Sequence, residues 1–328
     1  MKAIVRTKYG SPDVLELREI DRPVPKENQV LVKVHAASVN PLDWHLLRGE
    51  PFLVRFMGFG LFKPKSQILG ADIAGRVEAI GSNVTNFKVG DDVFGGGMGG
   101  FAEFTCMRED KLVPKPAALS FDQAASVPVA GLTALQALRD HGKIQSGQEV
   151  LINGASGGVG TFAVQIAKAY GARVTGVCSG RNIEMVRSIG ADHVIDYTKE
   201  SFWKSGKQYD LILDNAAFQS TRESLRALTP SGNYVMVGGD SSSTLSILLS
   251  LLVNPLIALI AKRKLISFMA RVNQADLAFL SELLSTGKVV PVIGRKYSLS
   301  EVPEAIRHIE TGHTRGKLIV TIVNGNRS

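Results

Sequence analysis

Cysteine is scarce in this sequence: Cys106 and Cys178 are the only two among 328 residues. Two thiols can form one disulfide at most, and they cannot form a four-cysteine zinc lobe. Such low cysteine use is typical of proteins kept in a reducing compartment. Residues 1–17 carry scattered charges and lack an apolar core of signal-peptide length. A cytoplasmic location is therefore the expectation.

Concentrated charge is also missing from the sequence. The net charge is +8, but the lysines and arginines are scattered, and residues 262–264 are their one tight run. Nucleic-acid binding normally needs such charges gathered on one face or along one stripe. The sequence therefore does not favour nucleic-acid binding as a main function.

The sequence lacks an unbroken apolar run long enough to cross a membrane. The longest candidate, residues 245–261, is interrupted by Asn254 and Pro255 and falls short of a comfortable span. Two interpretations remain open for this segment. It forms either a dimer-interface helix or an amphipathic membrane contact with a basic flank. The dimer interpretation is preferred, so a homodimer is expected.

Two patterns of secondary structure divide the chain. Up to about residue 120 the sequence is rich in predicted strands, among them 30–34, 73–80 and 101–105. From about residue 123, predicted strands and helices alternate, which is typical of a parallel, doubly wound sheet. The tail from about 291 contains a last predicted strand at 317–323. The predicted strands of the alternating region are 150–153, 173–178, 193–196, 211–213 and 234–237, and its predicted helices are 161–170, 183–189, 222–228 and 275–284.

The strongest motif is a glycine-rich turn that follows a predicted strand and precedes a predicted helix. A dinucleotide-binding fold requires this context. Glycine lets the backbone approach a pyrophosphate closely, and the helix N-terminus offers N–H groups and a positive dipole end to the phosphates. The residues of the turn, all predicted to bind a cofactor, are Gly154, Ala155, Ser156, Gly157, Gly158, Val159 and Gly160.

Around this turn the sequence resembles the quinone oxidoreductases and the related zeta-crystallins, zinc-free members of the medium-chain dehydrogenase/reductase superfamily. The resemblance extends over nearly the whole chain. It rests first on Gly147-Gln148, Leu151, the segment 155–158, Gly160, Gln165 and Lys168, and further on 38–43, 69–72, 90–93, 131–134, 190–192 and 316–317.

The resemblance implies an α/β protein of two domains. A GroES-like, β-rich catalytic domain would comprise residues 1–122, completed by 291–328. A Rossmann domain with a doubly wound parallel sheet would comprise residues 123–290. The resemblance also implies hydride transfer from NADPH to a small hydrophobic quinone or α,β-unsaturated carbonyl.

A catalytic zinc is not expected. Zinc alcohol dehydrogenases of the superfamily place a Cys in the segment here numbered 38–43 and a His-Glu pair after the glycine here numbered 70. This chain has Asn40 and Asp43 in the first place and Ala71-Asp72 in the second. Catalytic zinc needs three N, S or O ligands plus an open position. Asp43 is instead interpreted as a polar cap of a helix starting at Trp44.

The end of the second Rossmann strand indicates which nicotinamide is used. An NAD-specific site carries an acid there to bind the ribose 2′-OH. This chain has Ser179 and Arg181 and no acid in the segment 177–182. Arginine offers a planar, always-charged fork that suits a phosphate. Both residues resemble a 2′-phosphate clamp, so NADPH is predicted. The alternative is that Arg181 only begins a helix and faces solvent.

Candidate catalytic groups follow from the resemblance. Asn40 is the candidate for contact with nicotinamide or substrate, with a plain turn residue as the alternative. Thr133 and Lys317 stand at positions near the nicotinamide in the family, and Val237 and Gly238 are further predicted cofactor-binding residues.

Residues 50–62 are expected to border the substrate site, and they contain no tyrosine. Phe52, Phe56 and Phe59 are predicted to form an apolar entrance, with a packed surface loop as the alternative. The sequence offers no convincing general acid, so water is the expected proton source.

The predicted function is NADPH-dependent, zinc-free reduction of quinones or α,β-unsaturated carbonyls. Reduction of an enoyl thioester or an aldehyde by the same fold is one alternative. A non-catalytic RNA- or membrane-binding protein that retains the fold is another. An intact glycine turn and a 2′-phosphate site favour the enzyme, because a scaffold needs neither.

Overall fold

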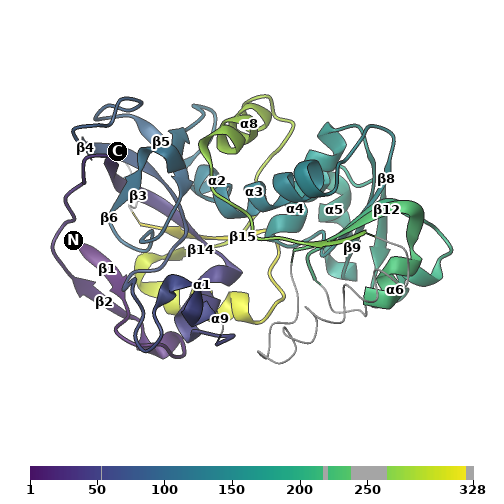
Figure 1. The fold of residues 1–328 in the computed structure, drawn as a ribbon, viewed down its shortest axis with the longest axis horizontal. Coiled ribbons are helices and arrows are strands. Elements are labelled where there is room, and N and C mark those ends of the chain that lie inside the picture. Colours follow the sequence, from purple (N-terminus) through teal and green to yellow (C-terminus); the bar gives the residue numbers. More distant parts are fainter. Residues whose placement is uncertain (53, 217–220, 238–263, 323–328) are drawn as a thin grey trace. The chain divides into compact units, whose positions relative to one another are not determined.

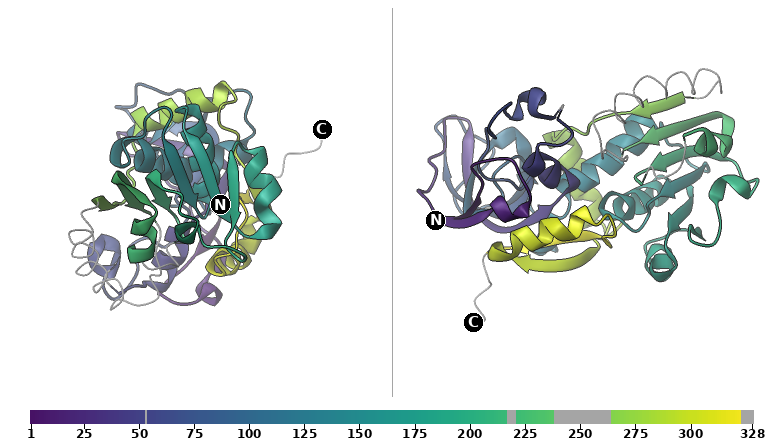
Figure 2. Two further views of the ribbon diagram at one scale, coloured as in Figure 1. Left: turned by 90° about the vertical axis from the view of Figure 1, so that its right-hand side faces the viewer. Right: turned by 90° about the horizontal axis from the view of Figure 1, so that it is seen from below.

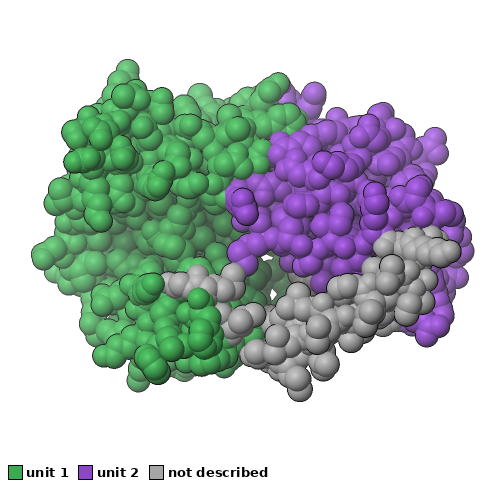
Figure 3. Space-filling model, in the orientation of Figure 1, with its two compact units in different colours: residues 1–132, 272–285, 291–328 green, residues 133–271, 286–290 purple. Residues whose placement is uncertain are grey.

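The computed structural model describes residues 1–52, 54–216, 221–237 and 264–322. The predictions for Gly238 and for the apolar run 245–261 lie outside the described residues. The chain divides into two compact units, which Figure 3 colours separately. Unit 1 comprises Met1–Leu132, Val272–Ser285 and Pro291–Ser328, and unit 2 comprises Thr133–Arg271 and Thr286–Val290.

The boundaries predicted from the sequence differ from this division in two segments. Residues 123–132 and 272–285, expected in the Rossmann domain, belong to unit 1. The second segment contains helix α8 (Gln274–Ser285), whose Leu280 side chain lies close to Gly131. The Gln274 side chain also donates a hydrogen bond to the Leu112 carbonyl at 3.2 Å. These contacts place α8 with the β-rich unit.

The described part of unit 1 is built on a seven-stranded sheet with β3 (Gln29–Val39) near its middle. Strand β3 pairs antiparallel with β15 (Lys317–Thr321), β4 (Asp72–Ile80) and β6 (Phe104–Arg108). The sheet therefore joins the C-terminal strand β15 to the N-terminal half of the chain. Its other strands are β5 (Asp92–Gly96), β7 (Leu112–Pro114) and β14 (Ile293–Ser298), and a separate antiparallel pair consists of β1 (Lys2–Val5) and β2 (Glu16–Glu19).

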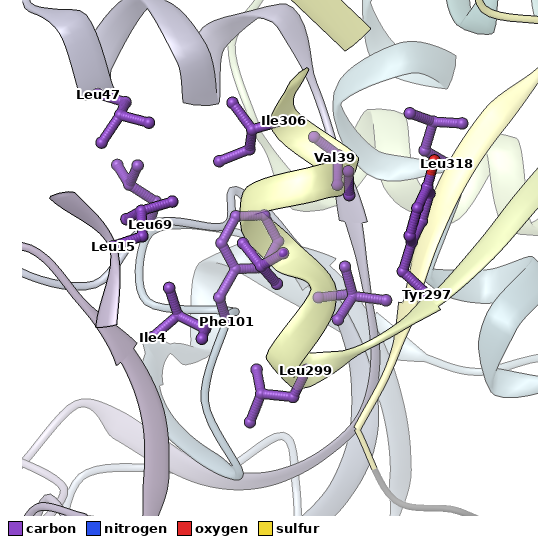
Figure 4. Packing of buried hydrophobic residues seen from close by; sticks show 14 of the residues in the cluster. Ile4, Leu15, Val39, Leu47, Leu69, Phe101, Tyr297, Leu299, Ile306 and Leu318 are labelled. Carbon is purple, nitrogen blue, oxygen red and sulfur yellow. The ribbon is translucent and has the colours of Figure 1, made fainter. Parts of the chain in front are cut away.

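The hydrophobic core of unit 1 also comes from both ends of the chain. Ile4 and Leu47 contribute from the N-terminal part, and Ile306 and Leu318 contribute from the C-terminal part (Figure 4). Burial of this cluster holds helix α1 (Pro41–Arg48) against helix α9 (Val302–Glu310). The other helices of this part are α2 (Phe121–Ala125) and α3 (Pro128–Gln136), which continues into unit 2.

The predicted strand at 101–105 is misplaced. Strand β6 begins only at Phe104, and Phe101 is fully buried before it. The Phe101 backbone accepts a hydrogen bond from the Ile4 N–H at 2.9 Å and donates one to the Leu69 carbonyl at 3.0 Å. Phe101 therefore joins two different segments, which a strand pattern read from the sequence cannot reveal.

The described part of unit 2 is a six-stranded parallel sheet in the order β10-β9-β8-β11-β12-β13. Figure 2 shows strands of this sheet side by side, and Figure 1 labels β8, β9 and β12 among them. The order reverses between β8 and β11, which defines the topological switch point of a doubly wound sheet. The strands are β8 (Glu149–Asn153), β9 (Arg173–Cys178), β10 (His193–Asp196), β11 (Tyr209–Asp214), β12 (Leu228–Met236) and β13 (Lys264–Ser267).

The helices of unit 2 follow its strands, but the predicted helix 222–228 is too long, because the helix there ends at Arg226 and Leu228 already begins β12. Helix α4 (Gly158–Ala169) leaves the glycine turn, and α5 (Ile183–Ser188) and α6 (Thr221–Arg226) follow later. Helix α4 starts three residues before the predicted residue 161, because Gly157 already takes the N-cap position. Among the described residues, no helix has the length and apolar character needed to cross a membrane.

Candidate active site

The glycine turn of unit 2 needs its glycines for two physical reasons. Gly154 has a φ of 75°, in the region that favours glycine. A Cβ on Gly160 would lie 2.1 Å from the Gly154 carbonyl oxygen and 2.8 Å from the Ala155 Cα. Helix α4 therefore packs directly on the turn, and the Ala155 N–H donates to the Val177 carbonyl at 3.0 Å, which ties the turn to β9.

The N-terminus of α4 suits a phosphate. The first N–H groups of an α-helix have no intrahelical acceptor, and they point along a favourable dipole. Gly157 and Gly158 at this end are half-buried, and because glycine has no side chain, the exposed part is backbone. The geometry of the predicted turn thus fits the diphosphate of a dinucleotide.

A buried amide at the switch point adds a residue that the sequence analysis missed. The Asn215 Oδ1 atom is buried and has no hydrogen-bond partner among the described residues. Its Nδ2 donates to the Asn153 carbonyl at 3.2 Å. A Cβ built on Gly154 would lie 3.5 Å from the Asn215 Cβ. Buried acceptors in proteins normally have a hydrogen-bond partner, so an unsatisfied acceptor here indicates a site where a ligand could donate a hydrogen bond.

Asp214 fixes the strand ends around this amide. Its carboxylate accepts from Asn153 Nδ2 and from the Ala216 N–H, at 2.8 and 3.1 Å, and also from the Tyr234 hydroxyl. Burial, followed by the charge of Asp214, raises the pKa of Tyr234 far above its ordinary value. Val237, predicted to bind the cofactor, is half-buried just after β12 and donates its N–H to the Asp214 carbonyl at 2.9 Å.

The loop after β9 carries the two residues predicted to hold a 2′-phosphate. Ser179 is half-buried at the start of this loop, and Arg181 is exposed. The buried Asn182 donates from Nδ2 to Ser156 Oγ at 3.1 Å and to Ser179 Oγ at 3.2 Å. This amide joins the loop to the glycine turn, which the sequence analysis did not foresee.

The structure places an acid beside this loop that the sequence analysis did not consider. Asp196, at the end of β10, has an Oδ2 atom only 2.7 Å from where a Cβ of Gly180 would lie. Its Oδ1 accepts from the Thr198 hydroxyl and N–H at 2.7 and 3.0 Å. The hydroxyl bond, then the N–H bond, lower the pKa of Asp196. The two bonds from Thr198 thus occupy the Oδ1 atom of Asp196.

In unit 1, Asn40 and Lys317 form one buried polar network. Asn40 is 2% exposed, and its Oδ1 accepts from Lys317 Nζ at 2.6 Å. Its Nδ2 donates to Asp72 Oδ2 at 2.8 Å. Lys317, 3% exposed, also lies 3.5 Å from Asp72 Oδ2. Burial lowers the pKa of Lys317, while the charges of Asp72 and Asp43 act in the opposite direction. The network fixes the orientation of the Asn40 amide.

Asp72 satisfies both of its oxygens in this network. Oδ2 also accepts from the Ser38 hydroxyl at 2.6 Å, and Oδ1 accepts from the Val129 N–H at 2.8 Å. Val129 belongs to α3, which also carries the predicted cofactor residue Thr133, itself buried. The carboxylate therefore connects β3, β4 and α3.

The predicted cap of α1 needs correction. The helix begins at Pro41, not at Trp44, and Asn40 is its N-cap residue. Asp43 is the third helical residue, and its Oδ2 accepts from the Asn40 N–H at 2.8 Å in a capping box. Its Oδ1 accepts from the Gly70 N–H at 3.0 Å. Asp43 thus clamps the segments of Asn40 and Asp72 together.

Asp43 gives unit 1 a pH-dependent stability. Burial raises the pKa of Asp43 to about 7, against the two N–H donors that lower it. A folded-state pKa above the unfolded value gives stability that is present at low pH and is lost as the pH rises toward 7. We expect the free energy of unfolding of the wild type, relative to Asp43→Asn, to fall by roughly 2–4 kcal/mol between pH 4 and pH 8. Parallel pH curves in denaturant titrations would contradict this.

The described aromatic residues of the predicted entrance differ in exposure. Phe52 and Phe56 are 48% and 62% exposed and pack edge to face at 5.3 Å. Phe59 instead packs against the core of unit 1, and this position does not favour it as an entrance residue. Arg55 supports the loop by donating to the Gly49 carbonyl at 3.0 Å and by covering the Tyr9 ring at 4.4 Å.

Residues of this polar network stand in the two segments where zinc alcohol dehydrogenases of the superfamily carry their zinc ligands. Asn40, Asp43 and Asp72 use their side chains for the hydrogen bonds described above. In the described ranges, no group of three His, Cys, Asp or Glu side chains could hold a metal ion. The residues present at these positions do not fit a catalytic zinc.

Comparisons with known proteins agree with this fold. The alcohol dehydrogenase GroES-like domain matches residues 26–117, and the zinc-binding dehydrogenase domain matches residues 189–320. A chloroplast envelope quinone oxidoreductase homolog of Arabidopsis thaliana is 36% identical, with 98% of each chain covered. A quinone oxidoreductase structure from Coxiella burnetii has 35% identity and a TM-score of 0.86, covering 98% of this chain and 99% of that one.

An Escherichia coli quinone oxidoreductase solved in complex with NADPH is 26% identical with a TM-score of 0.80, covering 98% of this chain and 100% of that one. The fold and the site thus define an oxidoreductase of the medium-chain dehydrogenase/reductase class. The chain belongs to the quinone oxidoreductase family of that class. The family and the combination of a GroES-like with a Rossmann fold, both predicted from the sequence, are confirmed.

Proposed function

We propose that this protein transfers a hydride from NADPH to quinones or α,β-unsaturated carbonyls without zinc. The observation that carries the proposal is the glycine turn at the switch point of the parallel sheet, where Asn215 has a buried acceptor without a partner in the described part of the chain. A nicotinamide cofactor accords with the family, and the NADPH complex of the Escherichia coli relative supports it. When bound, NADPH supplies the hydride.

Unit 2 supplies the residues that would hold the cofactor. The N–H groups at the start of α4 bind the diphosphate. Ser179 and Arg181 bind the 2′-phosphate, and the Asn182 amide keeps Ser179 beside Ser156. The Thr198 bonds keep the nearby Asp196 ionised, so the charge of Arg181 must also offset that carboxylate when a phosphate binds at this loop. Asn215 Oδ1, for which the described ranges show no partner, would accept from a donor group of the cofactor.

Unit 1 contributes Asn40 as the group that contacts nicotinamide or substrate. Its Oδ1 is held by Lys317 and one N–H of its amide by Asp72. An amide carries two N–H donors, and the bonds within the described ranges use one of them, so we assign the other to a ligand. Such a donor stabilises negative charge that develops on a substrate oxygen. Lys317 and Asp72 are then residues that position the Asn40 amide. Solvent supplies the proton that completes the reduction.

Chelation is expected to leave the activity intact. The positions at which zinc enzymes of the superfamily carry Cys and His-Glu hold Asn40 and Ala71-Asp72 here. We expect metal analysis of the purified protein to find no stoichiometric zinc, and we expect full turnover in the presence of a chelator. One zinc per chain, with activity lost on chelation and restored by zinc, would refute the proposal of a zinc-free mechanism.

Phe56 is expected to select for bulky acceptors. It is 62% exposed and contacts Phe52 edge to face. Removing an apolar contact costs a large substrate roughly 1–2 kcal/mol, or about tenfold in kcat/KM, because a large ring system covers more of it. Phe56→Ala should therefore impair a naphthoquinone more than a small enone. Equal losses for both substrates would mean that the loop is only structural.

The acceptor class is tested by a panel assay. NADPH oxidation is measured against quinones, enones, enoyl thioesters and aldehydes. The proposal expects the highest kcat/KM with quinones or enones. A clear preference for enoyl thioesters or aldehydes would support the alternative reductase, and no oxidation with any acceptor would support a non-catalytic scaffold. A homodimer and a cytoplasmic location stay proposals that rest on the sequence alone.

A further inference from the structure

We propose that the loop formed by residues 59–65 docks this protein on the surface of an anionic phospholipid bilayer. The inference does not depend on the cofactor or the acceptor. It rests on the exposed side chains of Phe62, Lys63 and Lys65, to which the proposed reaction assigns no role. We call this segment the Phe62 loop.

The tip of the Phe62 loop is strongly apolar and faces solvent. Phe62 is 87% exposed, and Leu61 beside it is 37% exposed. An exposed phenylalanine in water has a free-energy cost that contact with an apolar phase removes. A cluster of such residues marks an interaction surface.

The base of the Phe62 loop holds its tip outward. The Lys65 N–H donates to the Phe59 carbonyl at 2.9 Å, which closes the loop. The Tyr9 hydroxyl donates to the Phe59 and Gly60 carbonyls at 3.1 and 2.5 Å. Gly60 has a φ of 109°, which turns the chain sharply before the tip. Because the base is fixed, insertion of the tip requires little ordering of the loop.

The charged side chains of the Phe62 loop itself are of one sign. Lys63 and Lys65 are exposed and form no ion pair among the described residues. Residues 51–71 contain three basic residues and no Asp or Glu. The whole chain has a net charge of +8. An anionic surface attracts such lysines, and the attraction falls off within a Debye length.

A bilayer fits this loop better than a protein partner does. Phe62 stands between exposed residues at the tip of a closed loop, so a protein would need a matching pocket to cover it. A lipid interface accepts a protruding aromatic side chain without such a pocket, and its headgroups pair with the flanking lysines. The combination of one aromatic wedge with two lysines therefore favours an anionic membrane surface.

The test is co-sedimentation of the full-length protein with vesicles of phosphatidylcholine, with and without phosphatidylserine. Each lysine near an anionic surface contributes about fivefold to partitioning, equal to about 1 kcal/mol. Lys63→Gln/Lys65→Gln should then weaken binding to anionic vesicles roughly 25-fold, and Phe62→Ser about tenfold. Wild-type binding should weaken in high salt.

Matched controls come from exposed residues elsewhere on unit 1. Val24 is 84% exposed, so Val24→Ser removes an equally exposed apolar side chain. Lys26→Gln/Lys88→Gln removes two exposed lysines and lowers the net charge by the same amount. Both controls should bind within about threefold of the wild type. NADPH oxidation with a soluble quinone should be unchanged in Lys63→Gln/Lys65→Gln and in both controls, which separates docking from catalysis.

Two outcomes would overturn the proposal. If the wild type fails to bind anionic vesicles, the Phe62 loop is not a membrane contact, and a protein partner becomes the better explanation. If replacing Lys63 and Lys65 weakens vesicle binding no more than replacing Lys26 and Lys88 does, the binding reflects only the overall charge of the protein.

Discussion

Replacing Arg181 with alanine is expected to weaken NADPH binding about tenfold to a hundredfold and to leave NADH binding nearly unchanged. A charge-assisted hydrogen bond contributes roughly 1.5–3 kcal/mol, and about 1.4 kcal/mol corresponds to a factor of ten. Arg181 is exposed, so solvent screening favours the lower end of this range. NADH has no 2′-phosphate and loses little. Turnover at saturating NADPH should stay near that of the wild type.

Arg187 provides a matched control for this substitution. It lies on α5, its side chain is 58% exposed, and it pairs with Glu184 at 3.4 Å. Arg187→Ala removes the same charge from the same region without touching the loop after β9. Its cofactor preference should equal that of the wild type. If the wild type uses NADH as well as NADPH, or if Arg181→Ala weakens both equally, Arg181 only begins a helix.

Replacing Lys317 with methionine is expected to cost about 3–5 kcal/mol of the free energy of unfolding. Its ammonium lies 3.5 Å from the fully buried Asp72 carboxylate and donates to Asn40 Oδ1. Methionine keeps the apolar stem but leaves a buried charge without its counter-ion, which is costly. Denaturant titration of both proteins measures the difference.

Two further variants test whether the loss of stability comes from the buried ionic network or from the loss of any positive charge. Lys317→Met/Asp72→Asn removes both charges and should recover part of the lost stability, which a double-mutant cycle quantifies. Lys296 is 58% exposed and pairs with Asp122 at the surface, so Lys296→Met should cost only about 0–1 kcal/mol. Equal losses for Lys317→Met and Lys296→Met would contradict a buried ionic network.

The parts of the fold that depend on local pattern could be predicted from the sequence. The strands 173–178 and 193–196 match β9 and β10 residue for residue, because short apolar runs there end at glycine or at polar turns. The glycine turn was predictable for the same reason, since its strand, glycines and helix are contiguous. The misplaced strand at 101–105 failed because the backbone of Phe101 bonds to distant segments.

The parts of the site that depend on register could not be predicted. Asn215 reaches the glycine turn only because β11 pairs with β8, with Asp214 opposite Asn153. Asp196 approaches Gly180 only because β10 and β9 end at the same edge of the sheet. Lys317 and Asn40 meet through the antiparallel pairing of β15 with β3. No spacing in the sequence encodes these contacts.

Direct hydride transfer is the central claim, and isotope transfer measures it. The protein is given NADPH deuterated at the transferable C4 position together with a soluble enone, in the presence of a chelator. The account predicts that deuterium appears at the β-carbon of the reduced product, because NADPH supplies the hydride and no metal is required. A product without deuterium, or a reaction that proceeds only when zinc is added, would contradict it.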